Sequence, residues 1–530
     1  MDDSRANSRS ASGTTTRYKD VNPISGMCPI CIRECTVLCE IGKSALRGRE
    51  VLYPVPEQFG ESTASANKDF GLDWSHFQIL TELIGAEGIE PNSDMAVFPN
   101  ADVSTTVGGV PLKVPCLIAG LGSTAVAKNY WDGLAVGAAL AGTIVTVGEN
   151  VCGMDMESSY TSGKVQNSPD MQFRVNTFRE YWDGVHGEVA VQTNVEDERG
   201  GVDEYVLSKL EVNIVERKWG QGAKAIGGEV RLNTIEKAQT LKRRGYVVIP
   251  DPDDPEVQDA HKNGVFKTFE RHSRVGFPEM ESFVEGVEKL REQGAEKVFL
   301  KTGAYRPAAT AFALRCASEA KIDMLTFDGA GGGTGMSPVP MMNECSTPTV
   351  YLETQVLKGA QLLKSKGRHV PDISIAGGIT NETQLYKAIA LSNFGEGPIV
   401  KAVAQARAPL TAVFKADYFT QLSKDKKLPS SFVSTYGDEP SRFMVAYSEL
   451  HEKFGDDVYK IPPGAIGLYT YWADRIAVGL QQLMAGARKF KLENLSRGDL
   501  ASLTPLATDV TDIPMLHHVE TEKFESILLG

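Results

Sequence analysis

Residues 323–335 read DMLTFDGAGGGTG, an apolar run that ends in a glycine-rich turn. The same order of a short Val/Ile/Leu-rich run, a turn and a helix-like stretch recurs from about residue 95 onward. Such runs predict parallel strands, because these are buried on both faces and alternate with helices. We count seven, and an eighth is not distinct; they start near residues 114, 142, 209, 297, 323, 372 and 397.

These seven units favour a closed barrel over an open sheet. An open sheet usually carries its glycine-rich turn at one switch point, whereas here such turns follow at least four strands. The predicted fold class is therefore α/β, a (β/α)8 TIM barrel over residues 96–415. A mobile tail (1–26) and a cysteine segment with its lead-in (27–95) precede the barrel. A C-terminal helical extension (416–530) follows it.

The composition is that of a globular enzyme, with 42% hydrophobic and 23% charged residues. A net charge of −13 argues against nucleic acid as a ligand, and no basic run is longer than residues 242–244 (KRR). No apolar run reaches the ~18 residues of a membrane helix, and the polar start shows no secretion signal. We expect a cytoplasmic protein that binds neither nucleic acid nor membrane.

Half of the eight cysteines lie within twelve residues, at Cys28, Cys31, Cys35 and Cys39. In a cytosolic chain this C-x2-C-x3-C-x3-C pattern indicates a metal rather than disulfides. Zinc usually takes two separated cysteine pairs, whereas four compact thiolates are closer to the run that wraps an iron–sulfur cubane. The spacing favours [4Fe–4S], with zinc or a metal-free helix as alternatives. We expect the other cysteines to be small core residues, at Cys116, Cys152, Cys316 and Cys345.

Three glycine clusters in the second half of the chain predict an anion site. Glycine lets the backbone approach a ligand closely and lets N–H groups point at an anion. The clusters supply Gly331, Gly332, Gly333 and Thr334, then Gly377 and Gly378, and finally Gly395 and Gly397. The last two pairs are expected in the loops after the last two strands, where barrels often bind phosphate. Tight turns without a ligand are the alternative for any single pair.

Two further segments carry polar side chains at the ends of expected strands. Lys301 lies among Val, Phe and Leu, where a lysine is costly unless it meets an anion or reaches solvent. Gln221 and Lys224 follow another strand, in WGQGAKAIGG (219–228). The amide could bond a cofactor edge, and the ammonium a substrate carboxylate.

In this order, the motifs resemble the FMN-binding synthase domain of glutamate synthase, in its archaeal-type, stand-alone form. Residues 218–224 (KWGQGAK) are similar to its QGAKPG-x-GG segment, and 298–304 (VFLKTGA) to its strand ending in a flavin-contacting lysine. Residues 326–338 resemble its GGTG-x-SP loop, and 147–153 (VGENVCG) its GEGG loop. Residues 375–381 and 393–398 stand where its phosphate-binding loops stand. The resemblance runs from about residue 100 to 415, and residues 483–500 resemble the family's helical tail.

The resemblance implies FMN bound by Gln221, Lys301 and the glycine clusters, and a substrate held by Lys224, Glu149 and Arg243. It implies reduction of a 2-imino acid, 2-iminoglutarate in the family, to an L-amino acid with electrons relayed through the iron–sulfur cluster. Ferredoxin or a reductase subunit would supply electrons, because no G-x-G-x-x-G turn opens a dinucleotide domain. Ammonia would come free or from a separate amidotransferase subunit, and we expect a homo-oligomer.

The departures from the family fall near the substrate. No segment resembles an amidotransferase domain, and no cysteine follows Cys345, although the family's cluster cysteines lie after the barrel. Ala225 replaces a proline, and residues 248–255 are acidic where the family has histidines. Two alternatives therefore stay open: a related flavoenzyme such as an N-methylglutamate synthase subunit, or a non-catalytic electron-transfer subunit.

Overall fold

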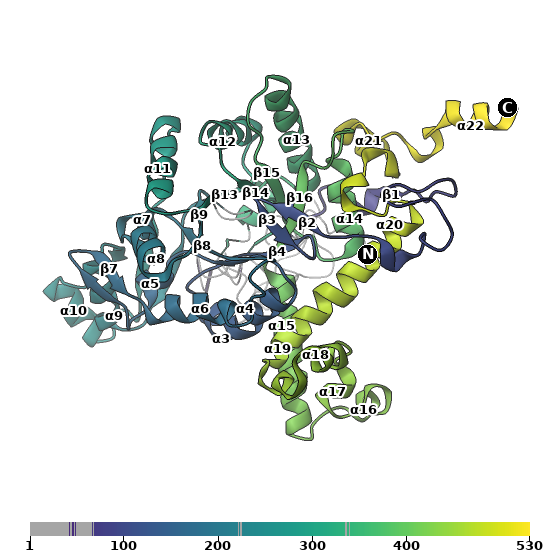
Figure 1. Cartoon of the computed structure of the whole chain (residues 1–530). Coiled ribbons are helices and arrows are strands. Elements are labelled where there is room, and N and C mark those ends of the chain that lie inside the picture. The colour runs from purple at the N-terminus through teal and green to yellow at the C-terminus, as the bar shows by residue number, and fades with distance from the viewer. Residues whose placement is uncertain are drawn as a thin grey trace.

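The structure, a computed structural model, describes residues 42, 45, 46, 48, 66, 68–220, 222, 225–333, 337, 338 and 340–530. Its centre is a closed barrel of eight parallel strands (Figure 1), in which the last strand pairs with the first. The strands are β4 (Cys116–Leu121), β5 (Val145–Val147), β8 (Val189–Thr193), β9 (Ile214–Lys218), β13 (Lys297–Gly303), β14 (Met324–Asp328), β15 (Asp372–Ala376) and β16 (Val400–Gln405). The predicted TIM barrel is confirmed.

The strand that the sequence left indistinct is β8. All five of its residues are buried, and it pairs with β5 and β9. It ends at Thr193, and the side chain of the next residue, Asn194, caps the helix α7 (Val195–Arg199), so no glycine-rich turn marks the end of the strand. The strand expected near residue 209 begins later, because residues up to Leu210 complete the helix α8 (Val202–Leu210).

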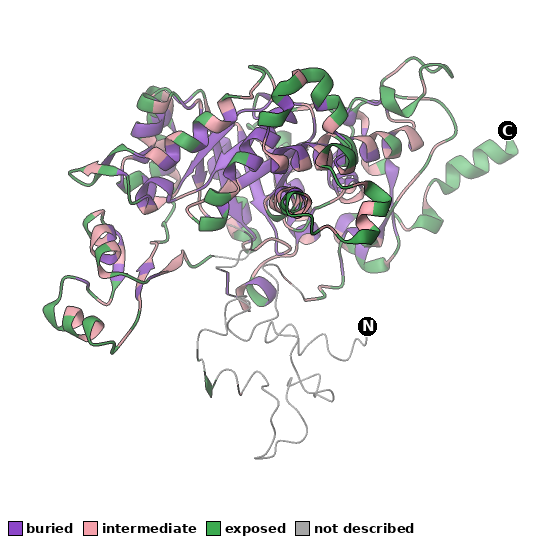
Figure 2. Ribbon diagram, turned by 90° about the horizontal axis from the view of Figure 1, so that it is seen from below, coloured by how far each residue is buried: buried purple, intermediate pink, exposed green. Residues whose placement is uncertain are grey.

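Helices cover the outside of the barrel, and several begin at a side-chain cap. Ser168 caps α6 and Asn381 caps α14, each by accepting a backbone N–H of the first turn. Their apolar faces pack on the strands, which Figure 2 shows as a buried centre under a half-exposed shell. The helices are α4 (Trp131–Leu140), α6 (Pro169–Arg179), α8 (Val202–Leu210), α11 (Met280–Glu292), α12 (Pro307–Glu319), α13 (Thr349–Ser365), α14 (Glu382–Leu391) and α15 (Arg407–Lys424).

A hairpin closes the amino end of the barrel. Its strands are β2 (Thr105–Val107) and β3 (Val110–Leu112), and Val107, Val110 and Leu112 join the side chains inside the barrel. The turn packs so closely that a Cβ on Gly108 would lie 2.5 Å from a ring carbon of Phe299. A ligand therefore has access to the barrel interior only from the carboxyl ends of the strands.

Residues 225–276 form an insertion between β9 and α11 that the sequence did not separate from the barrel. It contains β10 (Glu229–Leu232), α9 (Ile235–Arg243), β11 (Val247–Ile249), α10 (Pro255–Lys262) and β12 (Phe269–His272). The three strands make a small antiparallel sheet with its own apolar core around Leu241 and Phe269. In Figure 1 the insertion lies at the left edge, beside α5 (Val151–Met154) and α7.

The C-terminal part is mostly helical, but its predicted boundary at residue 416 is wrong. That position falls inside α15, because the last barrel helix is eighteen residues long. After it come α16 (Ser430–Tyr436), α17 (Pro440–Phe443), α18 (Tyr447–Phe454), α19 (Pro463–Tyr469), α20 (Ala477–Gly486), α21 (Pro505–Thr511) and α22 (Thr521–Leu529). None of the described helices is both long enough and apolar enough to span a bilayer.

The lead-in to the barrel packs with this C-terminal part. β1 (Phe77–Ile79) pairs antiparallel with β17 (Leu500–Ser502), and the amide of Asp102 donates to the carbonyl oxygen of Phe490. Figure 1 shows β1 beside α20 and α21, on the side of the barrel away from the insertion. The lead-in segment is thus joined by backbone hydrogen bonds to residues 490–502.

Candidate active site

A cleft of about 640 Å³ opens at the carboxyl ends of β4, β13, β14, β15 and β16. Small-molecule and cofactor sites usually have volumes of roughly 300–1,000 Å³, and barrel enzymes place theirs at this end. The apolar lining includes Ala119, Leu121, Ala376, Ile379, Ala404 and Ala406. The polar lining includes Lys301, Asp328, Gln405, Arg407, Lys415 and Tyr471.

Lys301 lies on β13 and is only 4% exposed. Its Nζ is 3.5 Å from Oδ2 of Asp328, which ends the neighbouring strand β14. A lysine in an apolar strand needs an anion or another polar partner, and Asp328 is one such partner. The predicted contact of Lys301 with a flavin stays a prediction. Both residues line the cleft, so the pair can act on a bound group.

Glycines in the loops after β14 and β15 line the cleft. Gly331, Gly332 and Gly333 form one loop, and Gly377 and Gly378 the other. Gly377 (φ +114°) and Gly378 (φ +82°) adopt backbone conformations that side chains disfavour. A Cβ on Gly331 would lie 2.6 Å from the carbonyl oxygen of Gly377. The two loops can pack together only because both are made of glycine.

Side chains from outside the loop fix the second glycine turn, residues 377–380. Oγ1 of Thr349 donates to the carbonyl oxygen of Gly377 at 2.7 Å, and the hydroxyl of Tyr471 donates to that of Thr380 at 2.6 Å. Nε2 of Gln405 donates to the carbonyl oxygen of Ile379 at 3.2 Å. These bonds hold the turn in place beside the cleft.

Two basic residues at the cleft were missed by sequence reasoning. Arg407 is the first residue of α15 and follows β16 directly, and Lys415 lies two turns later on the same helix. Partial burial lowers the pKa of the Arg407 guanidinium, a cost that a bound anion would offset. A helix N-terminus with an arginine is a favourable place for phosphate. The sequence feature that could have identified Arg407 is its position just after the last barrel strand.

Gly395 and Gly397 were predicted in a phosphate-binding loop, and this is wrong. They lie between α14 and β16, so they precede the last strand and stand at the amino end of the barrel. Oδ1 of Asn393 accepts the N–H groups of both glycines, at 2.8 and 3.1 Å. Their positive φ angles thus serve a tight helix-to-strand turn away from the cleft.

Glu149 lies at the barrel mouth, in the loop after β5. Nζ of Lys218, the last residue of β9, is 2.5 Å from its Oε1. A Cβ on Gly122 would lie 3.5 Å from Oε2 of Glu149, so the carboxylate stands beside the loop that continues from Leu121. Glu149 therefore lies at the mouth of the barrel. It stands beside Gly122, the residue that follows the cleft-lining Leu121.

Arg243 was predicted to hold a substrate carboxylate, but the structure places it elsewhere. It is an exposed residue at the end of α9, within the insertion, and its Nη2 donates to Oγ1 of Thr240 at 3.0 Å. Its neighbour Arg244 is the residue that reaches the barrel. Arg244 donates to the carbonyl oxygens of Gly153, Asp155 and Ser158 at 2.7–2.8 Å.

Several predicted site residues lie outside the described residues, namely Gln221, Lys224, Thr334, Cys28, Cys31, Cys35 and Cys39. Within the described part of the chain, no group of three or more His, Cys, Asp or Glu side chains could hold a metal ion. Cys116, Cys152 and Cys316 are buried core residues as predicted, whereas Cys345 is exposed.

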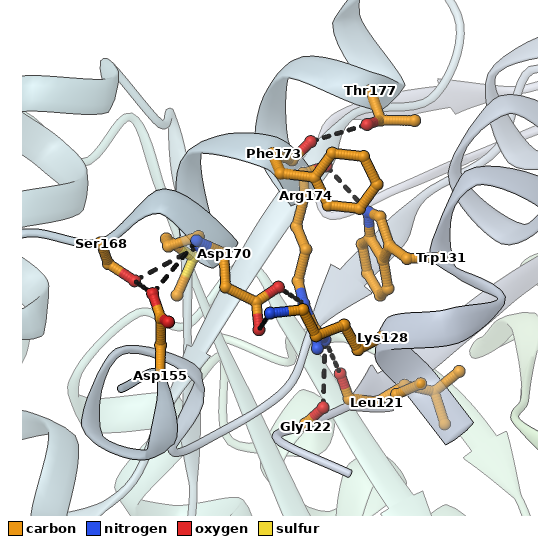
Figure 3. A network of polar contacts seen from close by, with 12 residues as sticks. Leu121, Gly122, Lys128, Trp131, Asp155, Ser168, Asp170, Phe173, Arg174 and Thr177 are labelled. Carbon is orange, nitrogen blue, oxygen red and sulfur yellow. Dashed lines mark hydrogen bonds and ion pairs between the residues drawn. The ribbon is translucent and has the colours of Figure 1, made fainter. Parts of the chain in front are cut away.

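Arg174 on α6 ties the first loop of the cleft to the outer helices (Figure 3). It is fully buried, its Nε donates to Oδ1 of Asp170 at 3.0 Å, and its guanidinium lies over the ring of Trp131. Its Nη1 donates to the carbonyl oxygens of Leu121 and Gly122 at 3.1 and 3.0 Å. Arg174 therefore fixes the two peptides at the edge of the cleft.

A carboxylate next to this arginine continues the network toward the insertion. Oδ2 of Asp155 accepts the hydroxyl of Ser168 and the backbone N–H of Asp170, at 3.1 and 3.2 Å (Figure 3). It also accepts the hydroxyl of Ser158 at 3.0 Å. Burial alone would raise the pKa of Asp155, but the combined hydrogen bonds lower it. Since Arg244 binds the carbonyl oxygen of the same residue, the insertion and the cleft edge share one polar network.

A second junction lies between the insertion and Asn150. The hydroxyl of Tyr246 donates to Oδ1 of Asn150, and the backbone N–H of Asn150 donates to Asp197 on α7. Asn150 has φ +65°, a conformation that asparagine tolerates better than most residues. Burial raises the pKa of Asp197 to about 7. The residue directly after Glu149 is thus held from two sides.

The donor set of the cleft fits a flat, anionic cofactor. Its walls are small apolar side chains and glycine backbone, which leave room for a ring system. A buried cation, Lys301, stands at one part of the lining, and Arg407 and Lys415 stand at an accessible part. This combination of charges matches a group with a polar ring edge and a phosphate.

Comparison with protein families gives one match. Residues 271–403 match the conserved region in glutamate synthase, from the end of the insertion into β16. The matched residues include Lys301, Asp328 and both glycine loops of the cleft. Glu149, Lys218 and Arg407 lie outside it.

Several solved structures are distantly similar to about four fifths of the chain. A soluble mutant of the membrane-associated (S)-mandelate dehydrogenase from Pseudomonas putida has 16% identity and a TM-score of 0.39, covering 81% of this chain and 88% of that one. A flavocytochrome b2 mutant with pyruvate bound has 12% identity and a TM-score of 0.44, covering 81% and 76%. A mandelate oxidase mutant has 11% identity and a TM-score of 0.40, covering 79% and 86%.

Likenesses this distant say nothing about cofactor or substrate. No curated protein matches the chain in sequence. The part of the barrel that carries Lys301 and the two glycine loops is thus similar to the conserved region of glutamate synthase.

Proposed function

We propose that this chain is an FMN-dependent oxidoreductase of the glutamate synthase type. One observation carries the proposal: the buried Lys301 and two interlocking glycine loops line one cleft, and all lie in the region similar to glutamate synthase. The position of the cleft also supports the proposal. It lies at the carboxyl ends of the strands, where barrel enzymes hold their reacting groups.

The lining offers a place for each part of FMN. The ammonium of Lys301 would stabilise negative charge at the pyrimidine edge of the reduced ring. Arg407, the N-terminus of α15 and the 377–380 turn would bind the phosphate, as helix N-termini and glycine turns do elsewhere. When bound, the flavin supplies two-electron reduction of an electrophilic carbon. The chain's own residues bind the flavin, orient it and exclude water.

The proposed substrate is a 2-imino acid, 2-iminoglutarate by resemblance, which would become an L-amino acid. Its carboxylates need cations at the mouth, and Lys218 and Lys224 are the candidates. Glu149, 2.5 Å from Nζ of Lys218, would keep that ammonium oriented until a substrate carboxylate competes for it. Arg243 has no part in this proposal, because it lies exposed in the insertion.

Electrons would enter through an iron–sulfur cluster held by Cys28, Cys31, Cys35 and Cys39. Ferredoxin or a reductase subunit would supply them. Ammonia would arrive free or from a separate amidotransferase subunit, and a homo-oligomer is the proposed assembly. A zinc site at the same four cysteines is the competing assignment.

The first test is purification without oxygen, followed by a visible spectrum and identification of the released cofactor. The flavin is then photoreduced and mixed with 2-oxo acids in the presence of ammonium. We expect 2-oxoglutarate with ammonium to reoxidise it, forming glutamate. If bound flavin is present and no 2-oxo acid reoxidises it, the substrate assignment is wrong while the flavin assignment stands. If the pure protein neither retains nor rebinds FMN, the proposed function is wrong.

Two glycines provide a matched pair for the cofactor site. Gly377 and Gly395 have similar strained backbones, with φ +114° and +103°. A Cβ at Gly377 would lie 2.6–2.9 Å from Thr349 and Gly329, whereas Gly395 has open space. We expect Gly377→Ala to lose flavin and Gly395→Ala to keep it, as measured by the flavin-to-protein ratio. Equal losses would show that strain alone matters and that the cleft is not the flavin site.

The cluster is tested by iron and sulfide analysis of two cysteine variants. Cys35→Ser removes one proposed ligand, and Cys345→Ser removes an exposed thiol outside the quartet. We expect Cys35→Ser to lose about one [4Fe–4S] per chain and Cys345→Ser to lose none. Stoichiometric zinc in the anaerobic protein would instead establish the structural-zinc assignment.

A further inference from the structure

The barrel interior changes from apolar to polar halfway along its axis. Near the amino end it is lined by apolar side chains such as Ile214, Phe299 and Met324. Side chains on a strand alternate between faces, so the residue two positions later also faces inward. These later positions hold polar side chains, each at most 4% exposed, at Thr146, Gln192, Glu216, Lys301, Thr326 and Ser374. We call these six residues the polar layer.

Only part of the polar layer is hydrogen-bonded by the protein. Nε2 of Gln192 donates to Oε1 of Glu216 at 2.5 Å. Among the described residues, four buried atoms of the layer have no hydrogen-bond partner: Oε1 of Gln192 and the hydroxyls of Thr146, Thr326 and Ser374. Such an atom costs roughly 1–3 kcal/mol when it is left without a partner. Four in one layer indicate bound water, which fills polar interiors and leaves apolar ones dry.

The polar layer reaches the floor of the cleft at two points. Gly120 lines the cleft, and a Cβ there would lie 2.7 Å from Oε1 of Gln192. The missing side chain therefore leaves that oxygen directly below the floor. Lys301 is the second point, because it belongs to the layer and also lines the cleft beside Asp328.

Glu216 is the one carboxyl of the layer. Burial raises its pKa, and the positive charge of Lys301 is the main opposing effect. The hydrogen bond from Gln192 and the charge of Lys218 also favour the carboxylate, whereas Glu149 disfavours it. Its ionisation therefore depends on how much of the charge of Lys301 is compensated by other groups.

We propose that Glu216 is a positioning residue that takes up one proton from solvent when negative charge develops in the cleft beside Lys301. The proton moves along water held by the polar layer. The only bond that forms is an O–H bond at a carboxylate oxygen of Glu216, and it breaks again when the charge is removed. This proposal rests on the proposed function for the source of that charge, which an external reductant supplies.

The physical reason is competition for the positive charge of Lys301, the largest charge effect on Glu216. With the cleft neutral, Lys301 stabilises the carboxylate of Glu216. When an anion forms on the cleft side, it shares the field of Lys301, and the buried carboxylate loses part of its stabilisation. Uptake of one proton keeps the net charge of the interior constant. A buried charge would otherwise remain uncompensated, which is the costly case.

The test measures the midpoint potential of the bound flavin between pH 6 and 9 in wild type, Glu216→Gln and Glu353→Gln. Glu353 is a matched control, because it is also fully buried but lies on α13, outside the barrel interior. One proton per two electrons changes a potential by about 30 mV per pH unit. We expect wild type and Glu353→Gln to show this extra slope over part of the range, and Glu216→Gln to lack it. Equal slopes in all three proteins would overturn the proposal.

A second measurement needs no cofactor and so separates the two proposals. The carboxylic C=O band of Glu216 is identified in the infrared difference between wild type and Glu216→Gln, and it is followed with pH. We expect Lys301→Met to raise the pH at which this band disappears, because the stabilising cation is gone. An unchanged titration would refute the link between Lys301 and Glu216, whether or not the chain binds flavin.

A milder variant covers the case in which Glu216→Gln fails to fold. Thr326→Val removes one hydroxyl of the polar layer, and this hydroxyl has no hydrogen-bond partner among the described residues. We expect it to slow proton uptake after rapid reduction, followed with a pH-indicator dye, while the number of protons taken up stays the same. If its uptake rate equals that of wild type, the layer does not carry the proton.

Discussion

The hydroxyl of Tyr246 donates a hydrogen bond of 3.1 Å to Oδ1 of Asn150, and through it the insertion is joined to the barrel mouth. We expect Tyr246→Phe to leave the Asn150 oxygen buried without this donor, at a cost of about 1–3 kcal/mol. Hydrogen exchange should accelerate in residues 229–272 more than in the barrel strands. Tyr418→Phe, at an exposed tyrosine, is the control and should change neither region. Uniform acceleration would show that the bond does not act locally.

The contact between Tyr246 and the barrel mouth also predicts that Gly153 cannot be replaced by a residue with a side chain without loss of stability. A Cβ at this position would lie 1.7 Å from the hydroxyl oxygen of Tyr246, so Gly153→Ala must displace the insertion. We expect protease cleavage within residues 225–276 and a loss of at least ~2 kcal/mol in the free energy of unfolding. Gly286→Ala, on α11 with no atom near its Cβ, should instead be neutral or slightly stabilising. Two equal losses would contradict the close approach.

The contacts of Arg174 predict that the stability of the protein and the retention of a cofactor in the cleft are coupled. Arg174→Met leaves the carboxylate of Asp170 with only Lys128 at 3.5 Å, and breaking a buried charge pair typically costs about 3–5 kcal/mol. It also frees the carbonyl oxygens of Leu121 and Gly122. We expect a lower urea midpoint and faster release of bound cofactor. Arg315→Met, at an exposed arginine, should stay within ~0.5 kcal/mol and release cofactor normally. Normal release from a destabilised Arg174→Met protein would refute the coupling.

Asp197 predicts how stability depends on pH. Burial raises its pKa to about 7 from the ordinary 3.8, so the folded protein keeps a proton that the unfolded chain has lost. Its contribution to stability is therefore full below about pH 4 and falls as pH rises to about 7, by up to ~1.4 kcal/mol per unit. We expect Asp197→Asn to remove this part of the slope in urea unfolding between pH 4.5 and 7.5. Parallel curves for variant and wild type would contradict it.

The barrel could be predicted because its strands are buried on both faces and so form apolar runs. The insertion could not, since its strands are short and half-exposed: β10 reads EVRL and β12 reads FERH. β8 was not recognised in the sequence for another reason. It is followed by the helix-capping Asn194 rather than by a glycine-rich turn. Sequence patterns thus identified the strands whose burial on both faces requires apolar residues. They missed the strand that ends at a capped helix and the strands of the small, half-exposed sheet.

The same logic separates the site residues. Lys301 and the glycines after β14 and β15 could be predicted, because a charge or a glycine stands out in an apolar run. Arg407 was missed, because an arginine at the start of a helix resembles any surface arginine and only its place just after the last strand distinguishes it. Gly395 was wrongly predicted to bind phosphate, because a glycine turn has the same composition before a strand as after it.

The pairing of β1 with β17 has a consequence for the order in which the protein is made. At ribosomal rates of about 5–20 residues per second, roughly 20–85 s separate the synthesis of Ile79 from that of its partner Leu500. Until the end of that interval β1, which includes the buried Phe77, lacks its partner strand. The nascent chain therefore carries an unpaired strand edge while the barrel forms, and such an edge can pair with another chain until β17 covers it.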